Sequence, residues 1–258
     1  MIYSDQLNNK INLYQSPKRI ISVVPSQTEL LYDLGLDSEV VGITKFCIHP
    51  EKWFRSKTRV GGTKQLNLEL IRDIEPDLII ANKEENSQQE LEILMKEFPV
   101  WITDIKTLND AYEMIEQISV ITNQHNQSVV INQQIKNEFL KLKNFKALTA
   151  AYFIWNEPLM TIGNDTFINE MMKHCGFKNV FGKNNRYPKV TENDLQKANP
   201  EFILLSSEPY PFKEKHKAYF QNICPQSKVI LVDGEMFSWY GSRLIKSPAY
   251  FLELRKNL

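Results

Sequence analysis

Short β-branched runs alternate with amphipathic stretches along this chain, and the alternation predicts strands and helices in turn. The apolar runs favour strands at 19–24, 39–43, 77–81, 100–103, 150–155, 201–205 and 228–232. Helices are expected at 26–34, 67–75, 87–98, 108–121, 125–145, 165–175, 191–199, 212–222 and 244–258, and a loop at 44–58. Strands separated by helices form parallel sheets with helices on both faces, so the sequence predicts an α/β protein.

Polar residues mark several helix starts. Ser26 and Glu29, like Ser87 and Glu90, are three positions apart, which is the pattern of a capping box. Two further helices are expected to begin after the N-cap residues Asn67 and Thr191.

One short pattern occurs twice, about half a chain apart. Residues 69–80 read ELIRDIEPDLII and residues 193–204 read NDLQKANPEFIL, each with a Pro-acidic pair before an apolar run. Two similar halves predict two lobes with a ligand cleft between them. The stretch 125–145, free of Gly and Pro, predicts one long interlobe helix. We therefore expect an N-terminal α/β lobe at 1–123, a linking helix at 124–146 and a C-terminal α/β lobe at 147–258.

Composition excludes several classes of protein. Lys+Arg and Asp+Glu are both 31, and this zero net charge argues against a nucleic-acid partner. No apolar run approaches the roughly 20 residues of a membrane span, and no secretory leader is visible. The expected location is thus cytoplasmic as the sequence stands, or periplasmic if a native leader was removed. Three widely spaced cysteines, Cys47, Cys175 and Cys224, indicate buried free thiols.

Four motifs resemble a known family. They are RIISVVPSQTELL with LGL at 19–36, VVGIT and VGGTK at 40–44 and 60–64, NLELIRDIEPDLIIAN at 67–82, and the TIG, GFKNVF and NP pieces between 160 and 200. In this order they resemble the helical-backbone (class III) substrate-binding proteins of ABC transporters, which serve cobalamin, iron-siderophores and haem. The likeness is nearest to the cobalamin-binding members, and a leaderless branch has similar motifs.

The resemblance implies two α/β lobes, a rigid linking helix and a monomer that binds a small-molecule metal chelate. It also implies docking to a transporter permease through one Glu on each lobe. Glu69 matches the first of these positions, and Asn193 occupies the second, where Glu192 and Asp194 flank it. Cys175 matches one of two cysteines that cobalamin-binding members pair, but no partner cysteine follows it in the last helix.

Candidate ligand-binding residues in the first half follow predicted strands. Free N–H groups at the helix start Pro25-Ser26-Gln27 favour a ligand anion or carbonyl, or serve only as a cap. His49, with Phe46 in the same loop, offers an axial imidazole for a chelated metal or is a surface histidine. Thr63 and Lys64 lie in a ligand-facing loop or a plain turn. Glu84 and Glu85 face the ligand or stabilise the next helix dipole.

Aromatic residues dominate the candidates of the second half. Trp155, Tyr187, Phe237, Trp239 and Tyr240 are expected to include ligand contacts, because three aromatics within 237–240 are not expected all to face the core. Arg243 pairs either with a ligand carboxylate or phosphate or with a surface acid. No catalytic motif, zinc site or cofactor signature is present.

These observations favour a non-enzymatic binding protein for a corrinoid, haem or ferric siderophore, which delivers its ligand to an ABC transporter. A second hypothesis is a leaderless cytoplasmic relative that acts as a ligand store, chaperone or sensor. A third, by analogy of fold, is a chelatase-like enzyme.

Overall fold

The chain folds into two compact units, each containing one five-stranded sheet, in a computed structural model that describes residues 1–142 and 145–258. Unit 1 comprises Met1–Ile105, Asn109–Ile135 and Tyr240–Arg243. Unit 2 comprises Lys106–Leu108, Lys136–Trp239 and Leu244–Leu258. The predicted α/β fold with mostly parallel sheets is confirmed.

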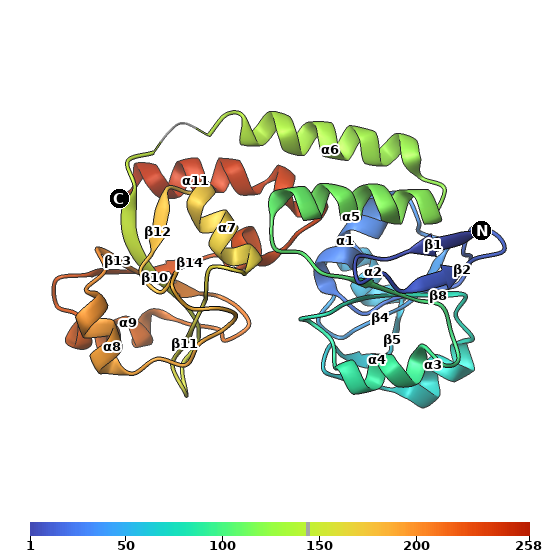
Figure 1. The fold of residues 1–258 in the computed structure, drawn as a ribbon, viewed down its shortest axis with the longest axis horizontal. Helices are drawn as coiled ribbons and strands as arrows, with labels where there is room; N and C mark the ends of the chain where they lie inside the picture. Colours follow the sequence, from blue (N-terminus) through green and yellow to red (C-terminus); the bar gives the residue numbers. More distant parts are fainter. Residues whose placement is uncertain (143–144) are drawn as a thin grey trace. The chain divides into compact units, whose positions relative to one another are not determined.

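The sheet of unit 1 is entirely parallel. Its strand order is β5 (Thr58–Arg59), β4 (Val40–Ile43), β3 (Ile20–Ser22), β8 (Leu78–Asn82) and β9 (Val100–Thr103). Figure 1 shows α3 (Leu68–Ile74) and α4 (Gln88–Leu94) on one face, with α1 (Pro25–Asp33) and α5 (Leu108–Ile121) on the other. Alternate strand residues such as Ile21 and Ile79 pack against Ile71 and Leu91 of α3 and α4. Coverage of both faces explains why these strands are apolar throughout.

Several small elements of unit 1 were not expected, among them β5. β1 (Ile2–Ser4) and β2 (Lys10–Asn12) form an antiparallel hairpin in a stretch that reads as polar. A second hairpin joins β6 (Gly61–Gly62) to β7 (Gln65–Leu66). Helix α2 (Glu51–Ser56) lies within the predicted loop 44–58, where Trp53 is fully buried. The loop prediction was wrong because this helix has six residues and buries only Trp53, so its sequence shows no helical repeat of apolar positions.

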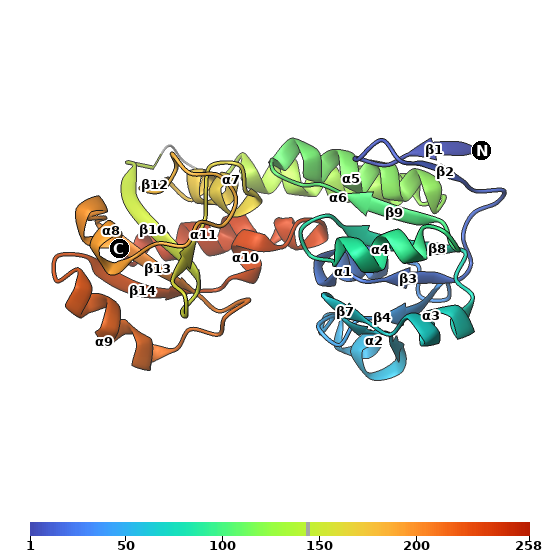
Figure 2. The same ribbon diagram turned by 60° about the horizontal axis from the view of Figure 1, so that its bottom comes forward.

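The sheet of unit 2 is also mostly parallel, but its edge strand β11 (Met160–Thr161) is antiparallel to its neighbour. The strand order is β11, β10 (Leu148–Trp155), β13 (Phe202–Ser206) and β14 (Lys228–Val232), and β12 (Phe177–Asn179) also pairs with β10. Figure 2 shows α8 (Glu192–Ala198) and α9 (Glu214–Ile223) beside this sheet. Phe153 and Leu205 pack against Leu195 and Phe220 of these helices. The remaining helices are α7 (Phe167–His174), α10 (Glu235–Ser238), the 3-10 turn Ser242–Ile245 and α11 (Ser247–Lys256).

The sequence repeat corresponds to the same local structure in both units. α3 and α8 begin at the side-chain N-caps Asn67 and Thr191, each of which accepts a backbone N–H in the first turn. Both helices end at a left-handed residue, Glu75 or Asn199, before the Pro-acidic pair. The acid then accepts N–H groups at the start of the neighbouring strand. Asp77 accepts those of Lys18 and Arg19, and Glu201 accepts that of Thr149.

The other two capping predictions were wrong. α1 begins at Pro25 with Val24 as its N-cap, so Ser26 lies inside the first turn and Glu29 is used elsewhere. Ser87 is the N-cap of α4 but makes no side-chain cap hydrogen bond, and the carboxylate of Glu90 accepts the N–H of Leu66. In both cases tertiary contacts claim the acid that a capping box requires.

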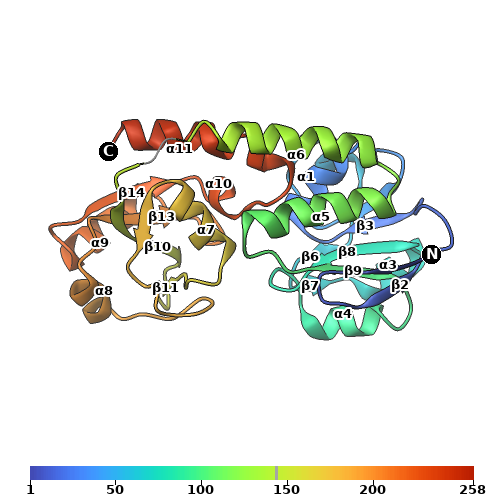
Figure 3. The same ribbon diagram turned by 45° about the horizontal axis from the view of Figure 1, so that its top comes forward.

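The long helix predicted at 125–145 is shorter in the structure. α6 spans His125–Phe139, and the part of the prediction at 143–144 lies outside the described residues. Figure 3 shows α6 running beside α5. Ser128 and Asn132 of α6 hydrogen-bond to Ser119 and Tyr112 of α5. The chain passes from unit 1 to unit 2 within α6, after Ile135.

Candidate functional site

The loops that follow the parallel strands of unit 1 meet at one edge of its sheet. They are 23–24 with the first turn of α1 after β3, 44–50 after β4, 83–86 after β8 and 104–105 after β9, with the β6–β7 hairpin beside them. Ligands of open α/β sheets bind at the carboxyl ends of the strands. The predicted residues Pro25 to Gln27, Phe46, His49, Thr63, Lys64, Glu84 and Glu85 all lie in these segments.

Asn86 is the residue that ties these loops together. Its side chain is 3% exposed, and its Nδ2 donates to the carbonyl oxygens of Val23 and Thr63, both at 3.0 Å. Its Oδ1 accepts the N–H of Asn82 at 2.8 Å. Lys64 Nζ closes the same junction by donating to the carbonyl oxygens of Asn86 and Glu84. The ammonium group of Lys64 thus holds the hairpin against the loop after β8.

A second buried network lies at the ends of β8 and β9. Asn82 Oδ1 accepts the N–H groups of Glu84 and Glu85, at 2.8 and 3.1 Å, and its Nδ2 donates to Thr103 Oγ1. Gln27 Nε2 also donates to Thr103 Oγ1. Gln27 is fully buried, and its Oε1 has no hydrogen-bond partner among the described residues. An unsatisfied buried acceptor is uncommon, and the donor it lacks is one that an internal water molecule would supply.

Glu85 is half-buried beside this network. Burial raises the pKa of its carboxyl group, and the negative charge of Glu84 raises it further, while Lys64 acts in the opposite direction. Phe46, in the loop after β4, is 49% exposed, and its ring lies beside Gly62 of the β6–β7 hairpin. The edge therefore offers one perturbed carboxyl group and an apolar ring.

His49 and Cys47 differ in exposure within the loop after β4. Cys47 is fully buried, where its Sγ lies 3.1 Å from the hydroxyl groups of both Thr28 and Thr44, and burial raises the pKa of this thiol. His49 is half-buried. No group of three or more His, Cys, Asp or Glu residues that could hold a metal ion occurs within 1–142 and 145–258. The predicted axial role of His49 stays a prediction.

The aromatic run of the second half is buried, which corrects one premise of the sequence analysis. Phe237, Trp239 and Tyr240 are 0%, 6% and 5% exposed, so all three face the interior. Phe237 packs against Tyr152 and Phe251, and Trp239 Nε1 donates to Glu208 Oε1 at 2.9 Å. Trp155 is the contrast, because it ends β10 with 40% of its surface exposed. Tyr187 is half-buried.

Arg243 is bound to an acid of its own chain. Its guanidinium group donates to both carboxylate oxygens of Glu29, at 2.7 and 2.8 Å, and Arg243 is 6% exposed. This buried pair differs from both expectations, a ligand anion or a surface acid. Contact between Arg243 and a ligand stays a prediction.

The predicted docking acids differ in the hydrogen bonds that their carboxylates make. Glu69 is exposed in the first turn of α3. Asp194 completes the capping box of α8 by accepting the N–H and hydroxyl of Thr191. Glu192 is exposed at the first position of α8, and its Oε1 accepts the hydroxyl of Tyr219 at 2.7 Å.

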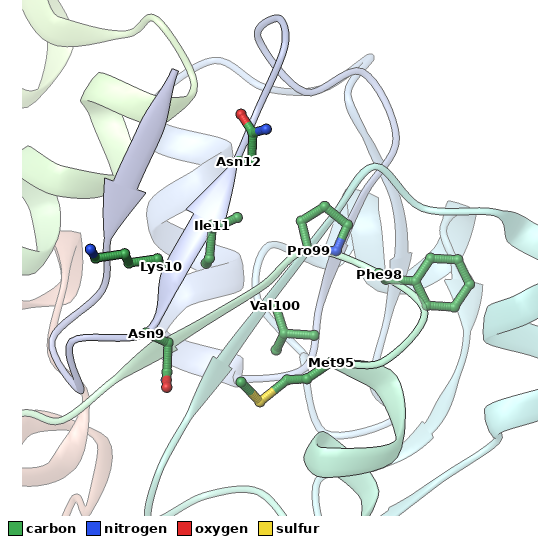
Figure 4. Close-up of a pocket in the computed structure, with 8 residues that line it drawn as sticks. All are labelled: Asn9, Lys10, Ile11, Asn12, Met95, Phe98, Pro99 and Val100. Carbon is green, nitrogen blue, oxygen red and sulfur yellow. The ribbon is translucent and has the colours of Figure 1, made fainter.

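A small hollow of about 130 Å³ lies elsewhere in unit 1 (Figure 4). It is lined by 9–12 of the β1–β2 hairpin and by Met95, Phe98, Pro99 and Val100. Because Val100 begins β9, the hollow lies at the amino end of that strand. It is therefore separate from the strand-end site.

Comparison with known proteins identifies the family. Residues 20–222 match the model of a family described as periplasmic binding protein, and the chain belongs to that family. A vitamin B12-binding protein of Pectobacterium carotovorum is 25% identical over 240 residues, covering 90% of this chain and 86% of the relative. An uncharacterised ABC transporter substrate-binding lipoprotein of Bacillus subtilis is 26% identical, covering 94% and 81%.

Solved structures share the fold. The periplasmic vitamin B12 binding protein BtuF of Vibrio cholerae has a TM-score of 0.79 at 21% identity, covering 94% of this chain and 99% of that one. The periplasmic heme-binding protein RhuT of Roseiflexus sp. RS-1 has a TM-score of 0.77 at 16% identity, with 92% and 98% covered. A protein of the Fe³⁺-hydroxamate transport system of Saccharomonospora viridis has a TM-score of 0.76 at 16% identity, with 98% of each chain covered.

These matches agree on the class of protein. The chain is a binding protein and not an enzyme, and the chelatase-like hypothesis has no support. Within the described residues, no helix combines the length and apolar character that crossing a membrane requires.

Proposed function

We propose that this protein binds a corrinoid and delivers it to an ABC transporter outside the cytoplasm. Membership of the periplasmic binding protein family, over a span that includes the strand-end loops of unit 1 and Trp155, is the observation that carries the proposal. The relatives named for vitamin B12 favour a corrinoid over haem or a ferric siderophore.

The chemistry of the strand-end site supports the same choice. A corrinoid bears amide side chains, whose N–H groups are donors. The site offers an acceptor, the half-buried carboxyl group of Glu85. Haem instead presents carboxylates, which favour arginine, and Arg243 is already bound to Glu29.

Docking is proposed to use Glu69 and Glu192. Both carboxylates are exposed near the N-terminus of a helix, and the phenolic hydroxyl of Tyr219 orients that of Glu192. Asp194 is the weaker candidate, because it is committed to its cap. Glu69→Gln is expected to weaken transporter binding while leaving ligand affinity unchanged.

Titration of the purified protein tests the ligand. Cyanocobalamin, dicyanocobinamide, haemin and ferrichrome are added separately, and binding is followed by calorimetry and by absorbance. We expect one of the corrinoids to bind with a Kd in the micromolar range or below. Tighter binding of haemin or ferrichrome would reassign the ligand, and no binding of any probe would overturn the proposal.

A further inference from the structure

Trp155 occupies an unusual place for an exposed tryptophan. It ends β10, the strand at the centre of the unit 2 sheet, and keeps 40% of its surface exposed. Its indole N–H donates to the carbonyl oxygen of Glu157 at 3.0 Å. Because the chain itself satisfies this donor, the exposed remainder of the side chain is ring surface, which binds through area and stacking.

Tyr210 packs against this indole from the loop between β13 and α9. The two ring centroids lie 5.7 Å apart at an interplanar angle of 65°, which is an edge-to-face contact. The N–H of Tyr210 also donates to the carbonyl oxygen of Ile154 at 3.3 Å. The loop is thereby tied to the carboxyl end of β10, beside the backbone of Trp155.

Other side chains hold Tyr210 in turn. Its ring packs against Phe212 at 4.7 Å and against His216 at 5.5 Å, and its hydroxyl lies 3.2 Å from His216 Nε2. His216 Nδ1 accepts the N–H of Lys213, so the neutral imidazole carries its proton on Nε2 and donates it to Tyr210. Phe212 is buried in the core of unit 2, which anchors the assembly.

We propose that Trp155 and Tyr210 form a rigid aromatic platform that contacts the flat face of the ligand, with Tyr210 as its positioning residue. The inference rests on the proposed function for the existence of a ligand. Ordering a large side chain on binding weakens affinity, and the contacts of Trp155 order its ring before the ligand arrives. A planar metal chelate is the class of ligand that gains most from such a surface, because its face is large and apolar.

The surroundings of the platform bear negative charge. Glu157 is exposed beside Trp155, and Glu192 lies against Tyr219 of α9. Burial, the hydrogen bond to Glu192 and the charges of both acids raise the pKa of Tyr219 to about 12. A ligand that places carboxylates here would be repelled, which is consistent with an amide-bearing or cationic chelate.

Two variants of Tyr210 test the platform, with dicyanocobinamide as the probe. Tyr210→Ala removes the supporting ring, and we expect binding to weaken about tenfold. Tyr210→Phe retains the ring and loses only the hydroxyl bond to His216, so affinity is expected to stay within about threefold of the parent. Tyr14→Ala, at a tyrosine that is 93% exposed in unit 1, is the control and should change nothing.

A ligand-free readout separates the platform from the proposed function. The near-ultraviolet circular dichroism signal that Trp155→Phe removes from the parent should also be lost in Tyr210→Ala and kept in Tyr210→Phe, which separates Trp155 from the buried Trp53, Trp101 and Trp239. Parental affinity of a folded Tyr210→Ala would overturn the platform alone, as would equal losses in both variants. If the parent protein binds no probe at all, the proposed function falls and the ligand role of the platform falls with it.

Discussion

Glu29 and Arg243 form a buried bidentate ion pair although 214 positions separate them in the sequence. Glu29 lies in α1, and Arg243 belongs to the short segment Tyr240–Arg243, which packs with unit 1 although Trp239 before it belongs to unit 2. Gly241 allows this close approach, because its φ is +108° and a Cβ there would lie 3.3 Å from the carbonyl oxygen of Ser26. The pair therefore holds the segment Tyr240–Arg243 against α1 of unit 1.

Removing one partner of this pair should be severely destabilising. Glu29→Gln or Arg243→Gln leaves a buried charge without its partner, and the free energy of unfolding is expected to fall by about 3–5 kcal/mol. Urea unfolding measures the loss. Arg55→Gln, at an exposed pair with Glu51, is the matched control and should change stability little. The interpretation fails if the buried and exposed variants behave alike.

Asn86→Ala should impair both stability and ligand binding. The change breaks three hydrogen bonds that join the loops after β3 and β8 to the β6–β7 hairpin. Each buried group left unsatisfied costs about 1–3 kcal/mol, so a loss of at least about 2 kcal/mol is expected, with weaker corrinoid binding.

Asn179→Ala is the matched control for Asn86. Asn179 also makes three hydrogen bonds, to Ile162, Asn169 and Phe181, but it lies in β12 of unit 2. Its variant should lose stability and retain corrinoid affinity. If the two variants lose affinity equally, Asn86 has only a general structural role.

Glu201 makes stability depend on pH in a predictable direction. Hydrogen bonds from the N–H and hydroxyl of Thr149 hold the pKa of this carboxyl group below its ordinary value of 4.5. Because the folded-state pKa is lower than the unfolded one, the stabilisation is complete above pH 4.5 and disappears as the pH falls through the folded-state pKa.

The comparison of wild type with Glu201→Gln isolates this contribution. Their difference in free energy of unfolding should be greatest near neutral pH and should shrink steadily on acidification. Thermal melts between neutral and acidic pH measure it, and a difference that does not vary with pH would contradict the assignment.

The three cysteines should be unreactive in the folded protein. Cys47, Cys175 and Cys224 are all buried, and burial raises the pKa of each thiol, in the case of Cys175 to about 12. Since the thiolate is the nucleophile, modification by Ellman's reagent should await unfolding. We expect all three thiols to react in urea and almost none without it. Rapid modification of any one in native buffer would show that its surroundings open.

Several features of the fold could be read from local sequence. Asn67 and Thr191 were predicted as N-caps and are N-caps, because a cap depends only on residues within one turn. The apolar runs ending near Asn82 and Ser206 are buried parallel strands, since burial on both faces leaves no alternation. The same local logic failed at Ser26 and Ser87, where Glu29 and Glu90 bind residues distant in sequence.

In the candidate site, too, the sequence predicted the local positions of residues but not their contacts with distant segments. The sequence placed Gln27 and Glu85 after strands and Lys64 in a turn, and the carboxyl edge of the parallel sheet brings these segments together. It did not indicate that Asn86 joins those loops, because the carbonyl groups it binds come from residues 23 and 63 positions away.

By itself, then, the sequence determined the α/β architecture, the repeated helix–Pro–acid–strand unit and the class of protein. Short-range periodicity and capping encode the first two, and the order of the family motifs encodes the third. Only the tertiary structure decided that Phe237, Trp239 and Tyr240 are buried while Trp155 stays exposed, and that Arg243 binds Glu29. Burial and pairing depend on which distant segments pack against a side chain, and composition around a single residue does not carry that information.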